Sequence, residues 1–330
     1  MFSFKRNTDS QTPLFFINEQ PVYTHFKKEE SKRIPPFRDS SKYLDSDDFR
    51  ERYGLTLKEG SEIKRAIQSN IVPESALKTK FYSIRKDLNQ RLYSEIDLRD
   101  TNKTITWRYP EKQNVWPGTQ ILIGSSGVGK TFLVIQQIVE ALKRKKKRKF
   151  IYVSPELAVD TTLKEITHNK RWFRWFQGVD VSDSAFEDSE TGSADAFWEK
   201  HVYPILKAAE PGTTIILDDA PDCVVHKHLQ RFLIKYLRTG RHKRIGIVSI
   251  QHNVRGGKWT SQSFSSVKFI TLFPRGGGKG KQVDFLNETV GLTRRQARDL
   301  VEVFGESGRS MTIHAWSPAV IFGPKYAVFV

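Results

Sequence analysis

From about residue 104 to the end of the chain, short apolar runs alternate with helical patterns. The runs are rich in β-branched residues, which is typical of strands buried in a parallel sheet: "TITWRY", "TQILIG", "KFIYVS", "TTIILDD", "RIGIVSIQ" and "VKFITLF". Helical stretches separate them, and the clearest places Val134, Ile138 and Leu142 on one face. This alternation predicts an α/β fold, a mainly parallel sheet with helices on both faces. The last two apolar runs, "RSMTIHAWSP" and "AVIFGPKYAVFV", predict a closing hairpin.

The first hundred residues follow a different pattern. Residues 1–45 mix charged residues, Ser and Pro without periodicity, so we expect a flexible N-terminal arm without its own core. Residues 46–103 predict a small helical appendage, with a capping box from Thr56 to Glu59. The expected division is therefore an arm over residues 1–45, this appendage, and one α/β domain over residues 104–330.

Composition limits the class of protein. A chain of 330 residues forms one large domain or two ordinary ones. The single cysteine, Cys223, excludes an internal disulfide framework and is typical of a reducing compartment or a virion interior. No apolar run approaches the roughly 18 residues of a membrane span, and the N-terminus lacks a signal-peptide core. We expect a protein that is neither membrane-spanning nor secreted.

The net charge of +17 is concentrated in the last third of the chain. Residues 226–330 hold 18 Lys and Arg against 5 Asp and Glu, whereas residues 111–225 hold 15 against 16. A charge that served solubility alone would be spread more evenly. Clustered cations of this kind favour contact with a polyanion such as nucleic acid.

One glycine-rich stretch, "GSSGVGKT", stands between a predicted strand and a predicted helix and matches G-x-x-x-x-G-K-[ST] in full. Its glycines allow backbone N–H groups to converge on phosphate oxygens, and the helix N-terminus adds a positive dipole end. In such a loop the lysine reaches the β- and γ-phosphates and the final hydroxyl binds Mg²⁺. The predicted nucleotide-binding residues are Gly124, Ser125, Ser126, Gly127, Val128, Gly129, Lys130 and Thr131.

Polar residues also end two of the later strands. The run "TTIILDDA" ends in Asp218 and Asp219, where one carboxylate can bind Mg²⁺ opposite Thr131 and the other can orient or deprotonate water. Gln251 ends "RIGIVSIQ", and the carboxyl ends of strands in open α/β sheets face the ligand. Simpler interpretations stay open: an acidic strand end that caps a helix, and a glutamine that leaves its strand for solvent.

These motifs narrow the class of nucleotide enzyme. A GTPase would need a guanine-reading N-K-x-D element, which the chain lacks, and a small-molecule kinase usually carries lid arginines on a shorter chain. The order of "GSSGVGKT", "IILDD" and "GRHKRIGIVSIQ" resembles the FtsK–HerA superfamily of DNA-pumping ATPases. Within it, the chain resembles the genome-packaging ATPases of double-jelly-roll dsDNA viruses, such as poxvirus-like giant viruses and virophages. The resemblance covers about residues 115–275, and we therefore expect residues 104–330 to form a P-loop ATPase domain.

The resemblance implies a ring, commonly a hexamer, that threads double-stranded DNA and hydrolyses ATP with Mg²⁺ to package a viral genome into a preformed capsid. It also implies capsid or portal-vertex partners, and a location in the virion or at the host-cell site of assembly. The residues that match the family's catalytic positions are Lys130, Asp218, Asp219, Gln251 and a trans-acting arginine, Arg241. Because the spacing before the strand is only approximate, Arg238 and Arg244 stay as rivals. The superfamily often has Asp-Glu where this chain has Asp-Asp, which leaves the catalytic base open.

Three further basic segments of the chain have more than one interpretation. The glycine-rich loops "RGGKW" (255–259) and "PRGGGKGK" (274–281) can line a DNA pore or be solvated loop tips. The run "KRKKKRK" (143–149) can be a helix C-terminus, a nuclear-localisation patch or a DNA contact. The histidines and Cys223 form no metal-ligand spacing.

Two other functions stay open beside a genome-packaging translocase. One is a helicase or segregation pump of the same superfamily. The other is a nucleotide-gated DNA-binding or capsid-structural protein without sustained turnover.

Overall fold

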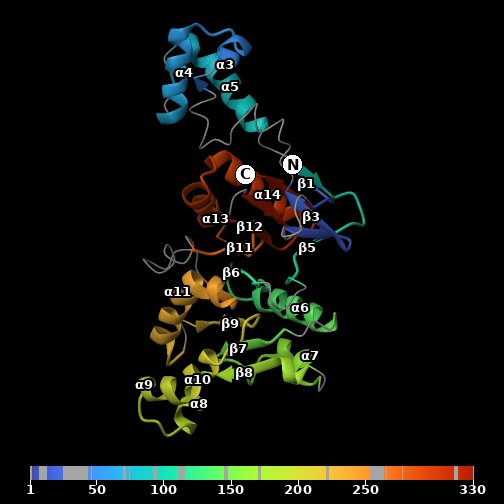
Figure 1. Cartoon of the computed structure of the whole chain (residues 1–330), viewed down its shortest axis with the longest axis vertical. Coiled ribbons are helices and arrows are strands. Elements are labelled where there is room, and N and C mark those ends of the chain that lie inside the picture. The colour runs from blue at the N-terminus through green and yellow to red at the C-terminus, as the bar shows by residue number, and fades with distance from the viewer. Residues whose placement is uncertain are drawn as a thin grey trace. The chain divides into compact units, whose positions relative to one another are not determined.

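The computed structural model of the chain divides into two units (Figure 1). One comprises Met1–Pro13, Val22–Ile96 and Val328–Val330, and the other comprises Leu14–Pro21 and Asp97–Ala327. The boundaries expected at residues 45 and 103 stay predictions. The residues described are 2–6, 13–24, 44–45, 47–69, 72–73, 75–91, 95–110, 116–144, 148–169, 172–220, 223–252, 264, 266–276, 278–315 and 319–329.

The second unit is built on parallel strands that bring the predicted motifs to neighbouring positions. β6 (Thr119–Ile123) pairs in parallel with β10 (Gly246–Gln251) on one side and β11 (Phe269–Leu272) on the other. Beyond β10 follow β9 (Thr214–Asp218), β7 (Phe150–Ser154) and β8 (Phe176–Asp180), again parallel. Because these strands run the same way, the carboxyl ends of β6, β9 and β10 lie at one edge of the sheet.

Antiparallel strands continue the sheet beyond β11. β12 (Met311–His314) pairs with β11, β13 (Val320–Phe322) pairs with β12, and β14 (Tyr326–Phe329) lies next to β13. The strand order is β14-β13-β12-β11-β6-β10-β9-β7-β8. The predicted α/β class with a mainly parallel sheet is confirmed, and the predicted closing hairpin is part of the sheet. Strand β8 escaped prediction because only part of its length is buried.

Helix α6 (Lys130–Lys143) packs on this sheet directly after the glycine-rich loop. Its apolar face shares one buried cluster with side chains from β6, β7, β9 and β10, which includes Val134, Ile135, Ile138, Val139, Leu122, Tyr152, Ile216 and Val248. Helix α11 (His226–Lys243) packs against β10, and α14 (Arg294–Ser307) packs against α13 (Lys279–Phe285). The shorter helices are α7 (Lys164–Thr167), α8 (Asp183–Asp188), α9 (Ala194–Phe197) and α10 (Tyr203–Lys207).

The acidic stretch 180–197, whose pattern suggests a solvated loop, contains two of these short helices. The Ser182 hydroxyl accepts a hydrogen bond from a backbone N–H at the start of α8, and Ser193 does the same for α9. Serine at the N-cap and Asp183 or Asp195 in the first turn are the residue types that stabilise a helix start. Local capping therefore orders this segment.

The first unit contains a small helical core of its own. Helices α3 (Asp47–Arg52), α4 (Leu57–Ser69) and α5 (Lys78–Arg91) surround a buried apolar cluster of Leu44, Phe49, Leu55, Ile63, Ala66, Ile67, Leu77, Phe81 and Ile84. The expected capping box is present: the Thr56 N–H donates to the Glu59 carboxylate (2.8 Å), and the Glu59 N–H donates to the Thr56 hydroxyl (3.3 Å). The helical character predicted for this segment is therefore observed, and β4 (Glu95–Asp97) follows it.

Residues expected in a flexible arm instead include strands. β1 (Phe2–Ser3) pairs antiparallel with β3 (Gln20–Thr24), and β2 (Phe15–Ile17) pairs antiparallel with β5 (Ile105–Thr106). Between β2 and β3 only Asn18 and Glu19 intervene, both with positive φ (44° and 74°), which is the conformation of a tight hairpin turn. Alternating apolar residues around this turn, rather than composition, were the signal for structure here.

Candidate active site

The loop between β6 and α6 has the backbone shape of a phosphate cradle. Gly127 and Gly129 have φ of 76° and 96°, a region that other residues rarely adopt. Gly129 is the N-cap of α6, and no side chain caps the helix there. The first N–H groups of α6 are therefore available to an anion, which the helix dipole also favours.

A second loop packs directly against this cradle. The Ser125 hydroxyl donates to the carbonyl of Gly276, and a Cβ added to Gly276 would lie 2.2 Å from Val128 Cγ1. Arg275 donates to the backbone carbonyls of Gly305 and Glu306 at the end of α14. The start of the stretch 274–281 is thus packed on the P-loop and on α14, in contrast to the flexible pore loop that its composition suggests.

The other basic segments considered for DNA contact have different outcomes. Lys279 and Lys281 in α13 are exposed. The loop 255–259 lies outside the described residues, as do residues 145–147 of the run at 143–149. Arg148 of that run is buried and donates to the carbonyls of Gly212 and Pro110, so it is not a surface cation.

Lys130 is held by the loop that precedes it. Its Nζ donates to the carbonyls of Gly124 and Ser125, both at 2.9 Å, and lies 3.3 Å from His252 Nδ1. Burial lowers the pKa of Lys130, while the charges of Asp219 and Asp218 oppose that shift. The ammonium is thus partly desolvated and bound to neutral acceptors, a state that favours exchange for a phosphate oxygen.

Asp218 ends β9 beside the first turn of α6. Its Oδ2 accepts hydrogen bonds from the Thr131 hydroxyl (2.9 Å) and from the Tyr152 hydroxyl on β7. Its Oδ1 is buried and has no hydrogen-bond partner among the described residues. Burial raises the pKa of Asp218, with the Tyr152 hydrogen bond opposing and the Asp219 charge adding to the shift. A buried carboxylate with one unpartnered oxygen beside a hydroxyl is incomplete without a cation.

This donor set fits Mg²⁺. The ion prefers hard oxygen ligands and is usually bound by one or two protein groups together with water and nucleotide phosphates. Asp218 and Thr131 would supply the protein oxygens. The described residues contain no group of three or more His, Cys, Asp or Glu side chains arranged to hold a metal by themselves. A site that is completed by phosphate therefore fits better than a closed protein cage.

Asp219 lies directly after β9, in a left-handed conformation (φ 46°). Aspartate is one of the few residues that tolerate this region, and such strain is concentrated at functional sites. Its Oδ1 lies 2.6 Å from His252 Nε2. The structure thus brings Asp219 to the predicted edge of the sheet, with a histidine as its neighbour.

Gln251 lies where β10 meets the cradle. Its carbonyl accepts a hydrogen bond from the Gly124 N–H (3.2 Å), while its side-chain Nε2 donates to the Ser249 hydroxyl (3.1 Å). The residue is therefore beside the P-loop, as expected from the strand end. Its role as a sensor stays a prediction.

Arg241 lies at the other end of β10 from this site. It belongs to the last turn of α11, rather than to a loop, and it is exposed together with Arg238 and Arg244. β10 has six residues, so about 20 Å of strand separates that end from Gln251. None of the three arginines is placed to serve the P-loop of its own chain, and the choice among them stays open.

Two residues of the site escaped sequence reasoning, Tyr152 and His252. Tyr152 is a fully buried tyrosine within the apolar run "KFIYVS", and a buried hydroxyl requires a partner. His252 follows Gln251 directly, so it leaves the same strand end. Both signals were present in the sequence, but the contacts depend on the strand order β9-β7 and on the path of the chain after β10.

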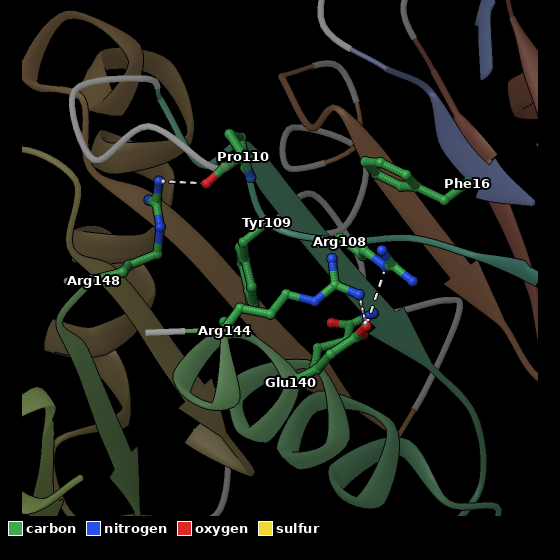
Figure 2. Close-up of a pocket in the computed structure, with 9 residues that line it drawn as sticks. Phe16, Arg108, Tyr109, Pro110, Glu140, Arg144 and Arg148 are labelled. Atoms are coloured by element: carbon green, nitrogen blue, oxygen red, sulfur yellow. Dashed lines mark hydrogen bonds and ion pairs between the residues drawn. The ribbon is translucent and has the colours of Figure 1, made fainter. Parts of the chain in front are cut away.

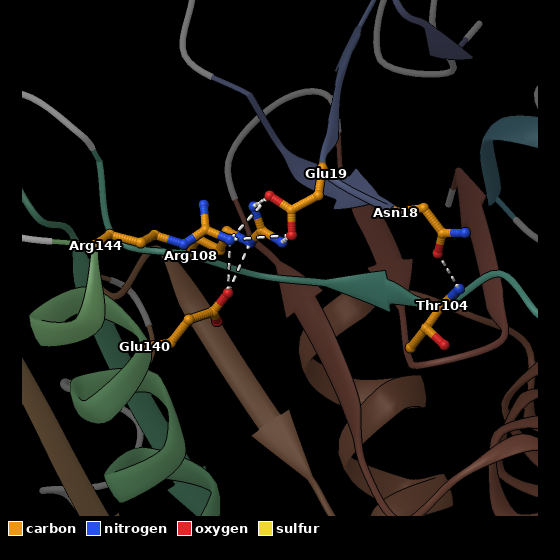
Figure 3. A network of polar contacts seen from close by, with 6 residues as sticks. All are labelled: Asn18, Glu19, Thr104, Arg108, Glu140 and Arg144. Carbon is orange, nitrogen blue, oxygen red and sulfur yellow. Dashed lines mark hydrogen bonds and ion pairs between the residues drawn. The ribbon is translucent and has the colours of Figure 1, made fainter.

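A second polar cluster surrounds the C-terminal end of α6 (Figure 3). Arg108 donates to Glu19 (2.8 Å) and lies 3.1 Å from Glu140, and Arg144 donates to the same two carboxylates (3.1 and 2.9 Å). The Asn18 side chain accepts from the Thr104 N–H (3.0 Å). Each charge in this Arg–Glu cluster therefore has an opposite charge beside it.

A small hollow adjoins the same cluster (Figure 2). The Tyr109 hydroxyl and Gln137 Oε1 on its wall are buried without a hydrogen-bond partner among the described residues. Burial lowers the pKa of nearby Arg148 to about 10. The hollow has room for little more than a water molecule, so it does not compete with the P-loop as a nucleotide site.

Within the described chain, no helix has the length and apolar character needed to cross a membrane.

Comparison with known proteins gives structural neighbours only. No family model and no curated protein sequence matches the chain. The genome packaging NTPase B204 of Sulfolobus turreted icosahedral virus 2 overlaps with a TM-score of 0.38 at 14% identity, over 63% of this chain and 97% of that chain. The type VII secretion ATPase EccC of Thermomonospora curvata gives 0.44 at 15% identity, over 72% of this chain and 29% of that chain.

The conjugation coupling protein TcpA of pCW3 gives a TM-score of 0.39 at 12% identity, over 71% of this chain and 65% of that chain. A viral genome packaging NTPase is thus among the structural neighbours.

Proposed function

We propose that this chain hydrolyses ATP with Mg²⁺ and uses the energy to move double-stranded DNA. The observation that carries the proposal is the incomplete site at the start of α6. The Lys130 ammonium lies on the carbonyls of the cradle, and Asp218 beside Thr131 has a buried oxygen without a partner among the described residues. A triphosphate with its cation would complete both.

Each residue has a defined task in such a reaction. The N–H groups of the cradle would bind phosphate oxygens, and Lys130 would exchange its carbonyl partners for the β- and γ-phosphates. Thr131 and Asp218 would hold Mg²⁺, which neutralises charge on the phosphates when bound. Asp219 would orient the attacking water or accept a proton from it. Gln251, whose carbonyl accepts a hydrogen bond from the Gly124 N–H, would respond to the occupant of the cradle.

We propose duplex DNA as the cargo because the last third of the chain is strongly basic, with 18 Lys and Arg against 5 Asp and Glu. Lys279 and Lys281 are exposed in α13, the helix that follows the loop packed on the P-loop. A change in the cradle would therefore be passed to cationic side chains. Packaging of a viral genome into a capsid, with capsid or portal partners and a location at the assembly site or in the virion, rests on the motif resemblance.

Translocation on blunt duplex DNA tests this proposal. We expect ATP-dependent displacement of a third strand from a triplex without separation of the duplex, and no displacement by Lys130→Ala. Unwinding of a forked duplex without triplex displacement would favour the helicase alternative. Tight ATP binding with no turnover would favour a nucleotide-gated binding protein.

We further propose a homo-oligomeric ring, commonly a hexamer in the resembling family, in which Arg241 of one subunit serves the site of the next. The support is its exposed place far from its own P-loop. Arg241→Ala alone should lose turnover, and mixing it with Lys130→Ala should restore part of it, because some interfaces then combine an intact cradle and an intact arginine. If turnover is instead restored when Arg238→Ala or Arg244→Ala is mixed with Lys130→Ala, that residue would be the trans-acting arginine in place of Arg241.

A further inference from the structure

His252 lies between two groups of the proposed hydrolysis site. Its Nε2 lies 2.6 Å from Asp219 Oδ1, and its Nδ1 lies 3.3 Å from Lys130 Nζ. The side chain is partly buried, as is that of Asp219.

The two contacts define the role of each ring nitrogen. An ammonium group can only donate, so Nδ1 must accept from Lys130 through its lone pair. The 2.6 Å contact between Nε2 and Asp219 Oδ1 does not have hydrogen-bond geometry, but a carboxylate can only accept, so Nε2 is the nitrogen that must carry the proton. This is one neutral tautomer of imidazole, with both ring nitrogens occupied by groups of the site.

Arrival of a nucleotide must change one of these contacts and not the other. The Lys130 ammonium has to leave its present acceptors to reach phosphate oxygens, and His252 Nδ1 is one of those acceptors. The carboxylate of Asp219 has no such reason to move. The imidazole would keep Asp219 while losing Lys130, which frees Nδ1 at the place that the lysine had occupied.

We propose that His252 is a positioning residue with two separable tasks: through Nδ1 it restrains Lys130 at the backbone carbonyls of the P-loop, and through Nε2 it orients Asp219 for hydrolysis. The inference rests on the proposed ATPase function. The first task opposes nucleotide binding, because Lys130 must be released. The second task supports turnover, because an Asp219 carboxylate in a strained backbone position has a fixed partner. Affinity and rate therefore depend on different nitrogens of one ring.

Two substitutions of His252 test the roles of Nδ1 and Nε2 separately. His252→Gln places its amide nitrogen as many bonds from Cβ as Nε2, so it keeps a donor for Asp219 and loses the acceptor for Lys130. His252→Asn places its carbonyl oxygen as many bonds from Cβ as Nδ1, so it keeps the acceptor for Lys130 and loses the donor for Asp219. The exposed His168, changed to Asn, is the matched control.

The readouts are the Kd for the non-hydrolysable analogue AMPPCP with Mg²⁺ and the kcat for ATP, both on the full chain. His252→Gln should bind AMPPCP about two- to tenfold more tightly, because one competing hydrogen bond is lost, and its kcat should fall less than that of His252→Asn, because it keeps a donor for Asp219. His252→Asn should leave Kd unchanged and lower kcat about tenfold or more, since Asp219 loses its orientation. His168→Asn should change neither value.

Parallel changes of Kd and kcat in both variants, or no change in either, would overturn the inference. Nuclear magnetic resonance of ¹⁵N-histidine-labelled full chain gives an independent readout: saturating AMPPCP should shift the Nδ1 signal of His252 and leave Nε2 protonated. An unchanged Nδ1 signal at saturation would also overturn it. Failure of the unchanged protein to bind AMPPCP would instead refute the proposed function, so the two failures are distinguishable.

Discussion

The two ends of helix α6 carry polar clusters of opposite character. At the N-terminal end, Lys130 donates to backbone carbonyls, and Asp218 has a buried oxygen without a partner among the described residues. At the C-terminal end, Arg108 and Arg144 each lie against Glu19 and Glu140. The charges of this second cluster are paired with one another. The difference distinguishes a candidate ligand site from a cluster that stabilises the fold.

The same contrast is visible in ionisation. Burial raises the pKa of Asp218 and lowers that of Lys130, so burial disfavours the charged form of both groups. At the other end, the hydrogen bond from Arg108 lowers the pKa of Glu19, which is the effect of a satisfied ion pair. Perturbation of buried ionisable groups towards their neutral form is typical of functional sites. Substitutions at the two ends should therefore have opposite consequences for activity and stability.

The largest effect is expected at Lys130. Lys130→Ala should reduce ATP turnover by about 10²–10³-fold, because the cation that faces developing phosphate charge is lost. Its thermal stability should change little, since a partly desolvated ammonium is removed along with its hydrogen bonds. Lys143→Ala, at the exposed far end of the same helix, is the control and should turn over ATP normally. Equal rates of ATP turnover for Lys130→Ala and the unchanged chain would refute the functional difference between the two ends of α6.

Asp218→Asn should lose turnover by about 10²-fold and yet raise the Tm of the nucleotide-free chain. The folded pKa of Asp218 is raised, so its ionised form destabilises the fold above that pKa and the penalty disappears as pH falls towards the ordinary carboxyl range. The Tm advantage of the variant should thus be largest near neutral pH and vanish in acid. Thermal unfolding across pH measures it, and a variant less stable than the unchanged chain at pH 7 would contradict this assignment.

The contact between the cradle and the loop after β11 predicts a smaller, reversible effect. Gly276→Ala would place a methyl group 2.2 Å from Val128 Cγ1. Overpacking of this kind costs about 1–3 kcal/mol, so ATP affinity should fall by about tenfold. Adding Val128→Ala should restore affinity because the clash is relieved, while Val128→Ala alone should bind nearly normally. A double variant as weak as Gly276→Ala would show that the two loops are not coupled through this contact.

The smallest effect is expected in the Arg–Glu cluster. Glu19→Gln should lower stability by at most about 1 kcal/mol, since the side chain of Glu19 is 71% exposed and solvent screens the pair. Because its folded pKa is lowered, the stabilisation exists above the ordinary carboxyl pKa and is lost as pH falls through the folded value. ATP turnover should be unchanged. Denaturant unfolding checks the stability and an ATPase assay checks the turnover. A loss of turnover would show that the Arg–Glu cluster also contributes to activity, which contradicts the difference between the two ends of α6.

Sequence patterns were sufficient for most strands of the sheet, although not for β8, and for the edge at which the site lies. The P-loop, the two aspartates and Gln251 each follow a buried parallel strand, and such strand ends meet at one edge whatever the details of packing. What the sequence did not show depends on contacts between segments remote in the chain. Tyr152 reaches Asp218 only because β7 lies beside β9, and His252 reaches Lys130 only through the path of the chain after β10.

Composition was the weaker guide. Residues 14–24 looked like part of an arm because charges and prolines surround them, yet the alternation around Asn18 and Glu19 forms a hairpin. Arg148 looked like one cation in a basic run, but it is buried and serves backbone carbonyls. Glycine and cations in 274–281 suggested a free loop, whereas Gly276 is required for close packing on Val128. In each case local pattern or packing overrode the average character of the segment.

ATP turnover by the purified full chain, measured with Mg²⁺ in the presence and absence of long duplex DNA, tests the central claim most directly. The account predicts turnover that requires Mg²⁺, rises with duplex DNA and is lost in Lys130→Ala. Turnover that is absent under all these conditions, or that persists in Lys130→Ala and ignores DNA, would contradict it.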